Sequence, residues 1–390
     1  MAQTIDQAKT GGFENVAVIG FGLIGASFAA ALRGANPSAQ VMAVDTDLAT
    51  RVEAVSRGWA TATAAPDAAE FRAFIEDGCD LVVLATPVSV VEGYLKDLAA
   101  WDYRGIITDT ASTKSRIIEM AAHTLPYPQN FVPGHPMAGS EKNGIVGARA
   151  DLFKGAYWIL CPDADTPAEH FTRLHELITG IGARVISLPR EQHDAAVAVV
   201  SHVPHFTASS LVQLAVRHAK GQDSLMRLAA GGFKDSTRIA AGSPELWCGI
   251  AFDNKDALLG GLREMQGIIG QFADALEAGD RATLTSLLAE AADARRALPA
   301  AWLPCTERLL EVRIPMEDRP GVVAEVTTIT SKVGCNIQSI EIDHVTEDSA
   351  VLSLVLTDEG DIGKLSAHLI NAGFSVSFSP LAPKEHTHVG

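Results

Sequence analysis

The stretch NVAVIGFGLIGASFAAALRG, residues 15–34, decides the fold of the first part of the chain. It opens with an apolar run rich in β-branched residues, as in a buried strand, and a helical pattern begins directly after its glycines. A second apolar strand is predicted at residues 40–44 and ends at Asp45. Strand, glycine-rich turn, helix and strand in this order predict the opening of an α/β fold of the doubly wound, Rossmann type.

The glycine-rich turn has the spacing of a dinucleotide-binding site. Gly20, Gly22 and Gly25 satisfy G-x-G-x-x-G, which allows a tight turn and a close approach of a pyrophosphate to the helix N-terminus. Alone, this hexapeptide is a weak signal. Asp45 follows Gly25 by 20 residues, where a carboxylate accepts hydrogen bonds from the adenosine ribose and repels a 2′-phosphate. The pair predicts NAD rather than NADP as the cofactor, with Asp47 as the alternative carboxylate.

Thr86 and Pro87 follow a third predicted strand at residues 80–85. Loops at the carboxyl ends of parallel strands line the ligand crevice of this fold, so we expect backbone contacts to the cofactor there. The predicted cofactor-binding residues are Gly20, Gly22, Leu23, Ile24, Gly25, Asp45, Thr86 and Pro87.

The chain changes its pattern twice. From Arg190 it becomes rich in Ala and Leu with helical periodicity, and strand periodicity returns after Pro304. In the last part, elements at 309–315, 320–333, 336–345, 350–357, 362–372 and 374–379 have a βαββαβ order. The predicted limits are a tail at 1–13, a dinucleotide-binding domain at 14–189, an all-helical domain at 190–303 and a βαββαβ domain at 309–382.

Composition and charge exclude several classes of protein. With 390 residues and 47% hydrophobic content, the chain can bury a sizeable core in two or three domains. A formal net charge of −16, a pI near 5.1 and the lack of a basic run exclude nucleic acid as a partner. The five cysteines are scattered without a C-x-x-C pair, which argues against a metal knuckle and indicates reduced thiols in the cytoplasm.

Residues 195–216 contain no Asp, Glu, Lys or Arg and have the composition of a membrane span. His202, Pro204, His205 and Gln213 interrupt the run, and burying these residues in lipid is costly. We therefore expect a buried helix and no membrane partner. Residues 1–12 lack the basic start and apolar stretch of a secretion signal, so we expect a loose tail there.

Four further segments place polar residues in apolar surroundings. They are DTASTK at 109–114, GHPMAGSE at 134–141, SHVPH at 201–205 and GGFKDSTR at 231–238. With residues 20–27, they resemble the prephenate and arogenate dehydrogenase family, whose pattern includes GxGLIGxS, D-x-x-S-x-K, HPMAGxE, SHxPH and GGFxDxTR in this order. Several motifs in order are far more specific than any one of them.

This resemblance implies oxidative decarboxylation of prephenate to 4-hydroxyphenylpyruvate with NAD, a step of tyrosine biosynthesis. It implies that His135 accepts the ring hydroxyl proton and that Ser112 hydrogen-bonds near that hydroxyl and the nicotinamide, without a covalent nucleophile. It also implies that the Arg238 guanidinium binds a substrate carboxylate. The predicted substrate-binding residues are His205, His202, Arg238, Gly231, Glu141 and Trp247.

Residues 309–380 resemble an ACT domain. Asp318 and Gly321 lie at the first strand-to-helix turn, and Asn336 and Ile337 enter the next strand. ACT domains of this kind bind small amino acids at subunit interfaces, so these four residues are the predicted effector site, with tyrosine as the expected effector. In the resembling family, the helical domain forms the interface of a homodimer.

Simpler interpretations stay open for several of these residues. Ser112 also suits a helix N-cap, since residues 113–120 have a helical pattern. His202 and His205 with Asp194 could bind a metal, although no Cys or Glu completes the set and we predict no metal. Arg238 could instead pair with Asp235 at the i, i+3 spacing.

Rival functions also remain. Arogenate is the alternative substrate, because it differs from prephenate only in the side chain. A hydroxy-acid dehydrogenase with an ACT tail is less favoured, because such enzymes insert the dinucleotide domain in mid-chain, whereas Gly20 lies near the start. A non-catalytic amino-acid sensor conflicts with the intact set of Ser112, His135, His205 and Arg238.

Overall fold

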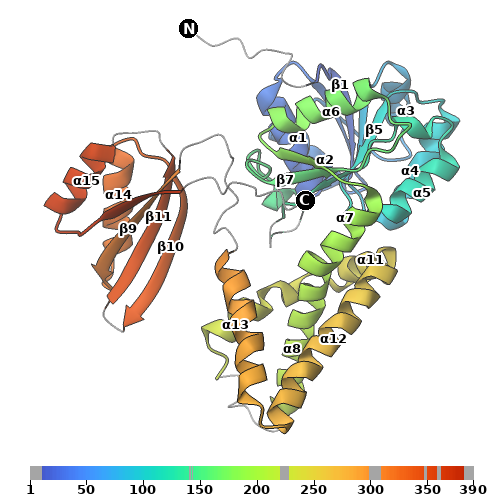
Figure 1. Cartoon of the computed structure of the whole chain (residues 1–390). Helices are drawn as coiled ribbons and strands as arrows, with labels where there is room; N and C mark the ends of the chain where they lie inside the picture. Colours follow the sequence, from blue (N-terminus) through green and yellow to red (C-terminus); the bar gives the residue numbers. More distant parts are fainter. Residues whose placement is uncertain are drawn as a thin grey trace. The chain divides into compact units, whose positions relative to one another are not determined.

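The computed structural model describes residues 11–139, 142, 144–219, 228–297, 309–346, 349–357 and 362–381. The chain divides into two compact units, Met1–Gly270 and Gln271–Gly390, and the boundary falls inside helix α12 (Lys255–Glu277). Each unit is described by itself (Figure 1). The domain limits predicted from the sequence pattern remain predictions.

A five-stranded parallel sheet forms the centre of the first unit, with the strand order β3-β2-β1-β4-β5. Its strands are β1 (Asn15–Ile19), β2 (Gln40–Val44), β3 (Ala62–Ala64), β4 (Leu81–Leu84) and β5 (Ile106–Asp109). Because β2 and β4 lie on opposite sides of β1, the order reverses there and a crevice opens at the carboxyl ends of β1 and β4. This confirms the predicted Rossmann-type fold.

Helices cover both faces of this sheet, and the two cores alternate along each strand. Val16 and Val18 join the core on one face, whereas Ala17 and Ile19 join the core on the other. The first core is completed by α1 (Leu23–Ala35), α2 (Leu48–Ser56) and α6 (Ala168–Gly180), and the second by α3 (Ala69–Glu76), α4 (Val88–Ala100) and α5 (Ser115–Thr124). Strands buried on both faces explain the continuous apolar runs in the sequence.

A second, three-stranded sheet has the order β6-β7-β8. It consists of β6 (Gly134–Pro136), β7 (Tyr157–Leu160) and β8 (Arg184–Ser187). β6 is antiparallel to β7, and β7 is parallel to β8. Trp158 on β7 is fully buried between Phe28 and Phe153. The short strand β6 was not predicted from the sequence, and it carries His135 in register with Ile159.

A long helix begins at Arg190 and runs to Ala219. It comprises α7 (Arg190–Val197), a π-helical turn (Ala198–His202) and α8 (Val203–Ala219). The π turn ends two residues before Pro204, whose ring and missing N–H interrupt the regular α pattern. α10 (Gly231–Thr237), α11 (Pro244–Asp253) and the first part of α12 follow in the same unit.

Among the described residues, Arg190–Ala219 is the one helix long and apolar enough to cross a membrane, judged by length and composition only. Of its apolar window, 33% is buried inside the chain. Core helices of soluble proteins pass the same test, so this finding is weak evidence for a membrane span. His202 and His205 inside this helix are buried against other parts of the chain, as expected for a core helix.

The second unit contains α13 (Arg281–Ala297) and a four-stranded antiparallel sheet with the order β10-β11-β9-β12. The elements of the sheet region are β9 (Leu309–Glu317), α14 (Val322–Lys332), β10 (Ile337–Thr346), β11 (Ser349–Thr357), α15 (Ile362–Asn371) and β12 (Ser377–Leu381). The order is the predicted βαββαβ order. Figure 1 shows α14 and α15 side by side on one face, where they cover a core that includes Val312, Ile314 and Leu352.

Candidate active site

The turn between β1 and α1 is built so closely that only glycine fits. Gly20 has φ +88°, and a Cβ there would lie 2.6 Å from the Ala85 carbonyl oxygen. A Cβ at Gly25 would lie 2.0 Å from the carbonyl oxygen of Gly20. Gly22 is the N-cap of α1 and provides no side-chain acceptor, so the first N–H groups of this helix remain available to an anionic ligand.

Asp45 at the end of β2 is tied to this turn. Its Oδ2 accepts a hydrogen bond from the Phe21 N–H (2.7 Å) and its Oδ1 accepts one from the Asp47 N–H (2.9 Å). Asp47 instead caps α2, where it accepts hydrogen bonds from Thr50, and these hydrogen bonds lower its pKa. Asp45 is therefore the carboxylate that lies beside the glycine turn.

A cleft of about 630 Å³ opens in front of the N-terminus of α1. Gly22, Leu23, Ile24, Thr86, Pro87 and Ser112 line it, together with residues of α11. The Thr86 hydroxyl is buried and has no hydrogen-bond partner among the described residues, as expected of a group that awaits a ligand. The glycine turn and this hydroxyl fit a dinucleotide, and they are the residues predicted to hold it.

Ser112 lies in the loop between β5 and α5 and faces the cleft half-buried. The alternative that it caps α5 is wrong, because this helix begins at Ser115 with Lys114 as the N-cap. The cap acceptor comes from far along the chain instead. Asp194 Oδ1 accepts the N–H of Lys114 (2.8 Å) and its Oδ2 accepts the N–H of Ser115 (2.8 Å). The Ser112 side chain therefore has no capping role here.

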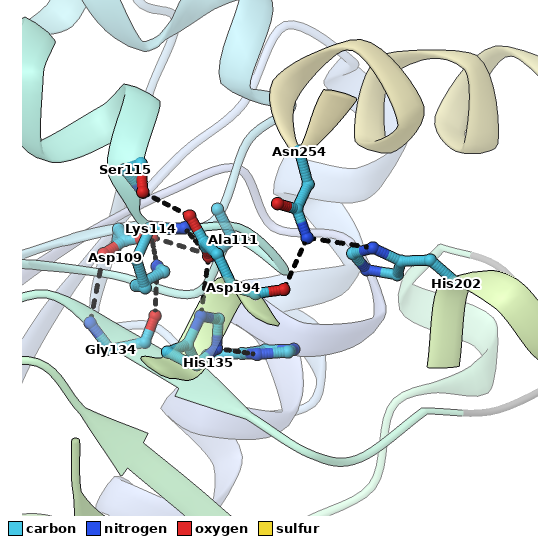
Figure 2. A network of polar contacts seen from close by, with 10 residues as sticks. Asp109, Ala111, Lys114, Ser115, Gly134, His135, Asp194, His202 and Asn254 are labelled. Atoms are coloured by element: carbon cyan, nitrogen blue, oxygen red, sulfur yellow. Dashed lines mark hydrogen bonds and ion pairs between the residues drawn. The ribbon is translucent and has the colours of Figure 1, made fainter. Parts of the chain in front are cut away.

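A buried polar network lies behind His135 (Figure 2). The His135 Nδ1 lies 2.8 Å from Nε2 of His193, and the His193 Nδ1 lies 2.8 Å from Oδ1 of Asp194. His135 is 7% exposed and His193 is fully buried. Burial would by itself raise the pKa of Asp194, but hydrogen bonds from His193, Ser115 and Lys114 lower it to about 2. The carboxylate is therefore ionised at neutral pH.

Burial also determines the state of His135. It lowers the pKa of this imidazole well below 6.5, and the positive charge of Lys114 lowers it further. A neutral imidazole is a hydrogen-bond and proton acceptor at cellular pH. The position therefore suits a general base.

A buried ion pair fixes the backbone that precedes His135. The Lys114 Nζ contacts Oδ2 of Asp109 and donates to the carbonyl oxygen of Gly134 (2.6 Å). The Asp109 Oδ1 accepts the Gly134 N–H (3.1 Å). Both polar backbone groups of Gly134 are thereby bound (Figure 2), which fixes the residue that comes directly before His135. Neither Asp109 nor Lys114 was predicted as a site residue, although both fall in the polar segment at 109–114.

His202 ends the π-helical turn and His205 lies in the first turn of α8, and the two side chains have different surroundings. The amide nitrogen of Asn254 donates to the Asp194 carbonyl oxygen (2.8 Å) and lies 3.2 Å from Nδ1 of His202, whose pKa burial lowers to about 4. His205 stacks on Trp247 with ring centroids 3.6 Å apart. His205 and Trp247 also line a second cavity of about 560 Å³. In the described part of the chain, no group of three or more His, Cys, Asp or Glu residues is placed to hold a metal.

The remaining predicted substrate residues are not brought into the cleft. Gly231 begins α10 and Arg238 follows it, and both are exposed. This segment packs against α8, the helix that carries His205. Glu141 lies outside the described residues.

The four predicted effector residues are separated within one copy of the chain. Gly321 has φ +87° and caps α14, and Asp318, three residues earlier, directly follows β9. Ile337, next to Asn336, pairs with Leu356, which also pairs with Leu310 at the start of β9. Leu356 follows Ser349, the partner of Glu317, by seven positions along β11, so Glu317 and Ile337 lie about 23 Å apart along the sheet.

Comparisons with known proteins match most of the chain. Residues 28–187 match the family model described as the nucleotide-binding domain of prephenate dehydrogenase, and residues 189–290 match its dimerization domain. A prephenate dehydrogenase of Bacillus subtilis is 32% identical over 352 residues, which are 89% of this chain and 93% of the relative. A cyclohexadienyl dehydrogenase of Zymomonas mobilis is 33% identical, over 73% of this chain and 96% of the relative.

Solved structures give a similar picture. The prephenate dehydrogenase of Aquifex aeolicus, in complex with hydroxyphenyl propionate and NAD+, has a TM-score of 0.69 and 27% identity. The match covers 73% of this chain and 98% of that structure. The arogenate dehydrogenase of Synechocystis has a TM-score of 0.61 and 28% identity, over 72% of this chain and 98% of that structure.

Proposed function

Because the chain belongs to the prephenate dehydrogenase family, we propose that it converts prephenate to 4-hydroxyphenylpyruvate with NAD, releasing carbon dioxide. The observation that carries this proposal is the cleft itself. It combines the glycine turn of a dinucleotide site with the loop of Ser112, and this loop continues into Lys114 and Ser115, whose N–H groups bind Asp194 of the network behind His135. The enzyme class, an NAD-dependent dehydrogenase, follows from the relatives and from the NAD+ bound in the A. aeolicus structure.

The cofactor would lie with its pyrophosphate at the N-terminus of α1. Gly20 and Gly25 allow the tight turn, Gly22 leaves open space for the pyrophosphate, and Asp45 would accept hydrogen bonds from the adenosine ribose. Thr86 would use its unpartnered hydroxyl in the same cleft. NAD, when bound, accepts the hydride from the ring carbon that bears the hydroxyl.

His135 would take the proton of the ring hydroxyl as the hydride leaves. Its lowered pKa keeps the imidazole neutral and able to accept a proton. The hydrogen bonds of Gly134 to Lys114 and Asp109 fix the backbone that precedes it. Ser112, which lines the cleft, would orient the hydroxyl by a hydrogen bond. The carboxylate on the ring then leaves as carbon dioxide, and the ring becomes aromatic, which supplies the driving force.

The substrate side chain would be recognised by the remaining predicted residues. A guanidinium such as that of Arg238 binds a carboxylate at two points, and His205 would face the side chain while stacked on Trp247. Prephenate and arogenate differ only in this side chain. Arogenate is the second candidate, because a cyclohexadienyl dehydrogenase and an arogenate dehydrogenase are among the similar proteins.

A homodimer would form through the helical domain. Residues 189–290 match a dimerization domain, and α8 exposes Leu211, Leu214 and Val216, which are 40–55% exposed in the single chain. Apolar side chains on one helix are expected to be covered by a partner. Polar residues inside the same helix argue against a membrane span. We therefore propose a cytoplasmic enzyme whose exposed apolar side chains on α8 are buried in the dimer.

The βαββαβ region would be an ACT-type regulatory domain that binds tyrosine. Asp318 follows the end of β9 that lies about 23 Å along the sheet from Ile337, so a site that uses all four residues needs two copies of the chain. Tyrosine binding is expected to be lost in Asn336→Ala and kept in Lys332→Ala, which removes an exposed side chain on α14. Calorimetric titration of both full-length variants with tyrosine would decide this, and binding that survives Asn336→Ala would contradict the assigned site.

The test of the proposed reaction compares substrates and cofactors. Initial rates of NADH or NADPH formation are measured with prephenate or arogenate, each with NAD and with NADP. The proposal expects the highest kcat/KM for prephenate with NAD. A higher kcat/KM for arogenate would move the assignment to the second candidate, and no turnover of either compound would reject both.

A further inference from the structure

His193 takes no part in the chemistry proposed so far, yet both of its ring nitrogens are engaged. It lies on α7, fully buried, between His135 and Asp194. One nitrogen faces Nδ1 of His135 and the other faces the carboxylate of Asp194, each at 2.8 Å. Figure 2 shows that His135 and Asp194 belong to the same network. A buried histidine in this arrangement determines which hydrogen-bonding groups its neighbours can present.

The direction of the hydrogen bonds is set by Asp194. Its two oxygens also accept backbone N–H groups from Lys114 and Ser115 at 2.8 Å each. A carboxylate that is ionised only accepts hydrogen bonds, so the Nδ1 of His193 must carry the proton in the contact with Oδ1 of Asp194. With a single ring proton, His193 carries it on Nδ1 and has its lone pair on Nε2.

The contact with His193 also determines which nitrogen of His135 carries the proton. The lone pair on Nε2 of His193 accepts a hydrogen bond, so the Nδ1 of His135 carries the proton that it donates. A neutral His135 with its proton on Nδ1 has a free lone pair on Nε2. This nitrogen is then the only one on the ring that can accept a proton.

We propose that His193, oriented by Asp194, is a positioning residue that holds His135 in the tautomer whose Nε2 accepts the substrate's hydroxyl proton. The proposal rests on the function proposed above. In the reaction, the O–H bond of the substrate breaks and a bond to Nε2 of His135 forms, which makes His135 an imidazolium. His193 keeps its acceptor toward the Nδ1–H of that ring, and the charge of Asp194 lies behind it.

The expected size of the effect comes from other histidine bases. General-base catalysis contributes about 10² to 10⁴ in rate, and loss of the correct tautomer in a serine protease lowers kcat by about 10⁴. Without His193, His135 can exchange between its two tautomers, and only one of them is productive. The loss should fall in kcat, because His193 is buried behind His135 and does not contact the substrate cleft.

The direct test is the tautomer of His135 in the full-length protein. The chain is labelled with ¹⁵N-histidine, and the His135 signals are identified by their loss in His135→Asn. The proposal expects a protonated Nδ1 and an unprotonated Nε2 in the wild type at pH 7.5. An unprotonated Nδ1 with a protonated Nε2 would overturn it, and this measurement needs neither substrate nor turnover.

Two variants of His193 separate hydrogen bonding from packing. His193→Leu removes both polar groups, whereas His193→Gln keeps an acceptor and a donor on one amide. We expect His193→Leu to lower kcat on prephenate about 100-fold with KM changed less than about threefold, and His193→Gln to remain within about tenfold of the wild type. His123→Leu, a change of an exposed histidine on α5, is the matched control and should leave kcat unchanged.

The outcomes are distinct. A kcat for His193→Leu within about threefold of the wild type would overturn the proposal. So would an equal loss in both His193 variants with the wild-type tautomer of His135 retained. If the wild type itself does not oxidise prephenate, the proposed function fails, while the ¹⁵N spectrum still decides how His193 sets the tautomer.

Discussion

The glycine turn of the cofactor site and the network behind His135 are two adjoining sites built in opposite ways. The first consists of main-chain atoms within residues 20–25, and it works because side chains are absent. The second consists of side chains from β5, the N-cap of α5, β6 and α7, and it works because each side chain is present. We therefore expect NAD binding at the turn to weaken when a side chain is added there. We expect catalysis to weaken when a side chain of the network is removed.

The largest effect is expected from removal of the base in the network. His135→Asn should lower kcat on prephenate about 10³-fold, because general-base assistance is lost, while the Kd for NAD changes less than about twofold. Steady-state rates and calorimetric titration with NAD measure the two quantities. His123→Asn is the matched control on the exposed surface of α5. A parallel loss of NAD binding would show that the two sites are not separate.

The next effect adds a single methyl group to the turn. In Gly25→Ala the new Cβ would lie 2.0 Å from the Gly20 carbonyl oxygen, so the backbone must move and the Kd for NAD should rise about 30-fold, about 2 kcal/mol. Gly34→Ala adds the same methyl to the same helix where nothing lies within 4 Å, and should stabilise the protein by about 0.5–1 kcal/mol. Urea unfolding and NAD titration separate stability from binding, and unchanged NAD affinity in Gly25→Ala would refute the close-approach argument.

A smaller effect is expected at the carboxylate beside the turn. Asp45→Ser should raise the Kd for NAD about tenfold and reduce the preference for NAD over NADP. The substitution removes both the carboxylate that accepts hydrogen bonds from the ribose and the charge that repels a 2′-phosphate. Asp47→Ser is the control, since serine can still cap α2. The measurement is kcat/KM with each cofactor. A preference that changes in Asp47→Ser but not in Asp45→Ser would exchange their assigned roles.

The smallest effect concerns stability and pH. Burial lowers the folded-state pKa of His202 to about 4 and that of His135 well below 6.5, so the unfolded chain binds more protons below pH 6.5. The contribution of these two histidines to the free energy of unfolding is complete above about pH 6.5 and is lost as the pH falls toward 4. The urea midpoint should therefore fall as the pH is lowered from 7.5 to 4.5. It should fall less steeply with pH in His202→Gln than in the wild type. Identical slopes in both proteins would contradict this view of His202.

The same contrast explains what the sequence could predict. The glycine spacing, Asp45 and the apolar strands depend on neighbours along the chain, and the five-stranded parallel sheet confirms the fold drawn from them. The network joins Lys114 to Asp194 across 80 residues, and no spacing rule links such positions. The only signals for it were charged residues beside long apolar runs, namely the segment at 109–114 and Asp194 before the uncharged residues 195–216.

The three-dimensional structure corrected one expectation about a helix cap and added the spatial placement of the predicted effector residues. Ser112 was a reasonable helix cap by pattern, but the true acceptor for α5 is a carboxylate from another helix. Asp318, Gly321, Asn336 and Ile337 were predicted as an effector site at a subunit interface, and the strand register adds that Asp318 and Ile337 lie at opposite ends of the strands in one copy of the chain. Sequence distance is a poor guide to distance across a sheet with crossovers.

The most direct test of the whole account is the stoichiometry of the reaction with prephenate and NAD. The purified chain should form NADH, carbon dioxide and 4-hydroxyphenylpyruvate in equal amounts, because one hydride and one carboxylate leave each ring that becomes aromatic. NADH without carbon dioxide would indicate a hydroxy-acid dehydrogenase. No NADH from either prephenate or arogenate would contradict both the reaction and the role assigned to His135.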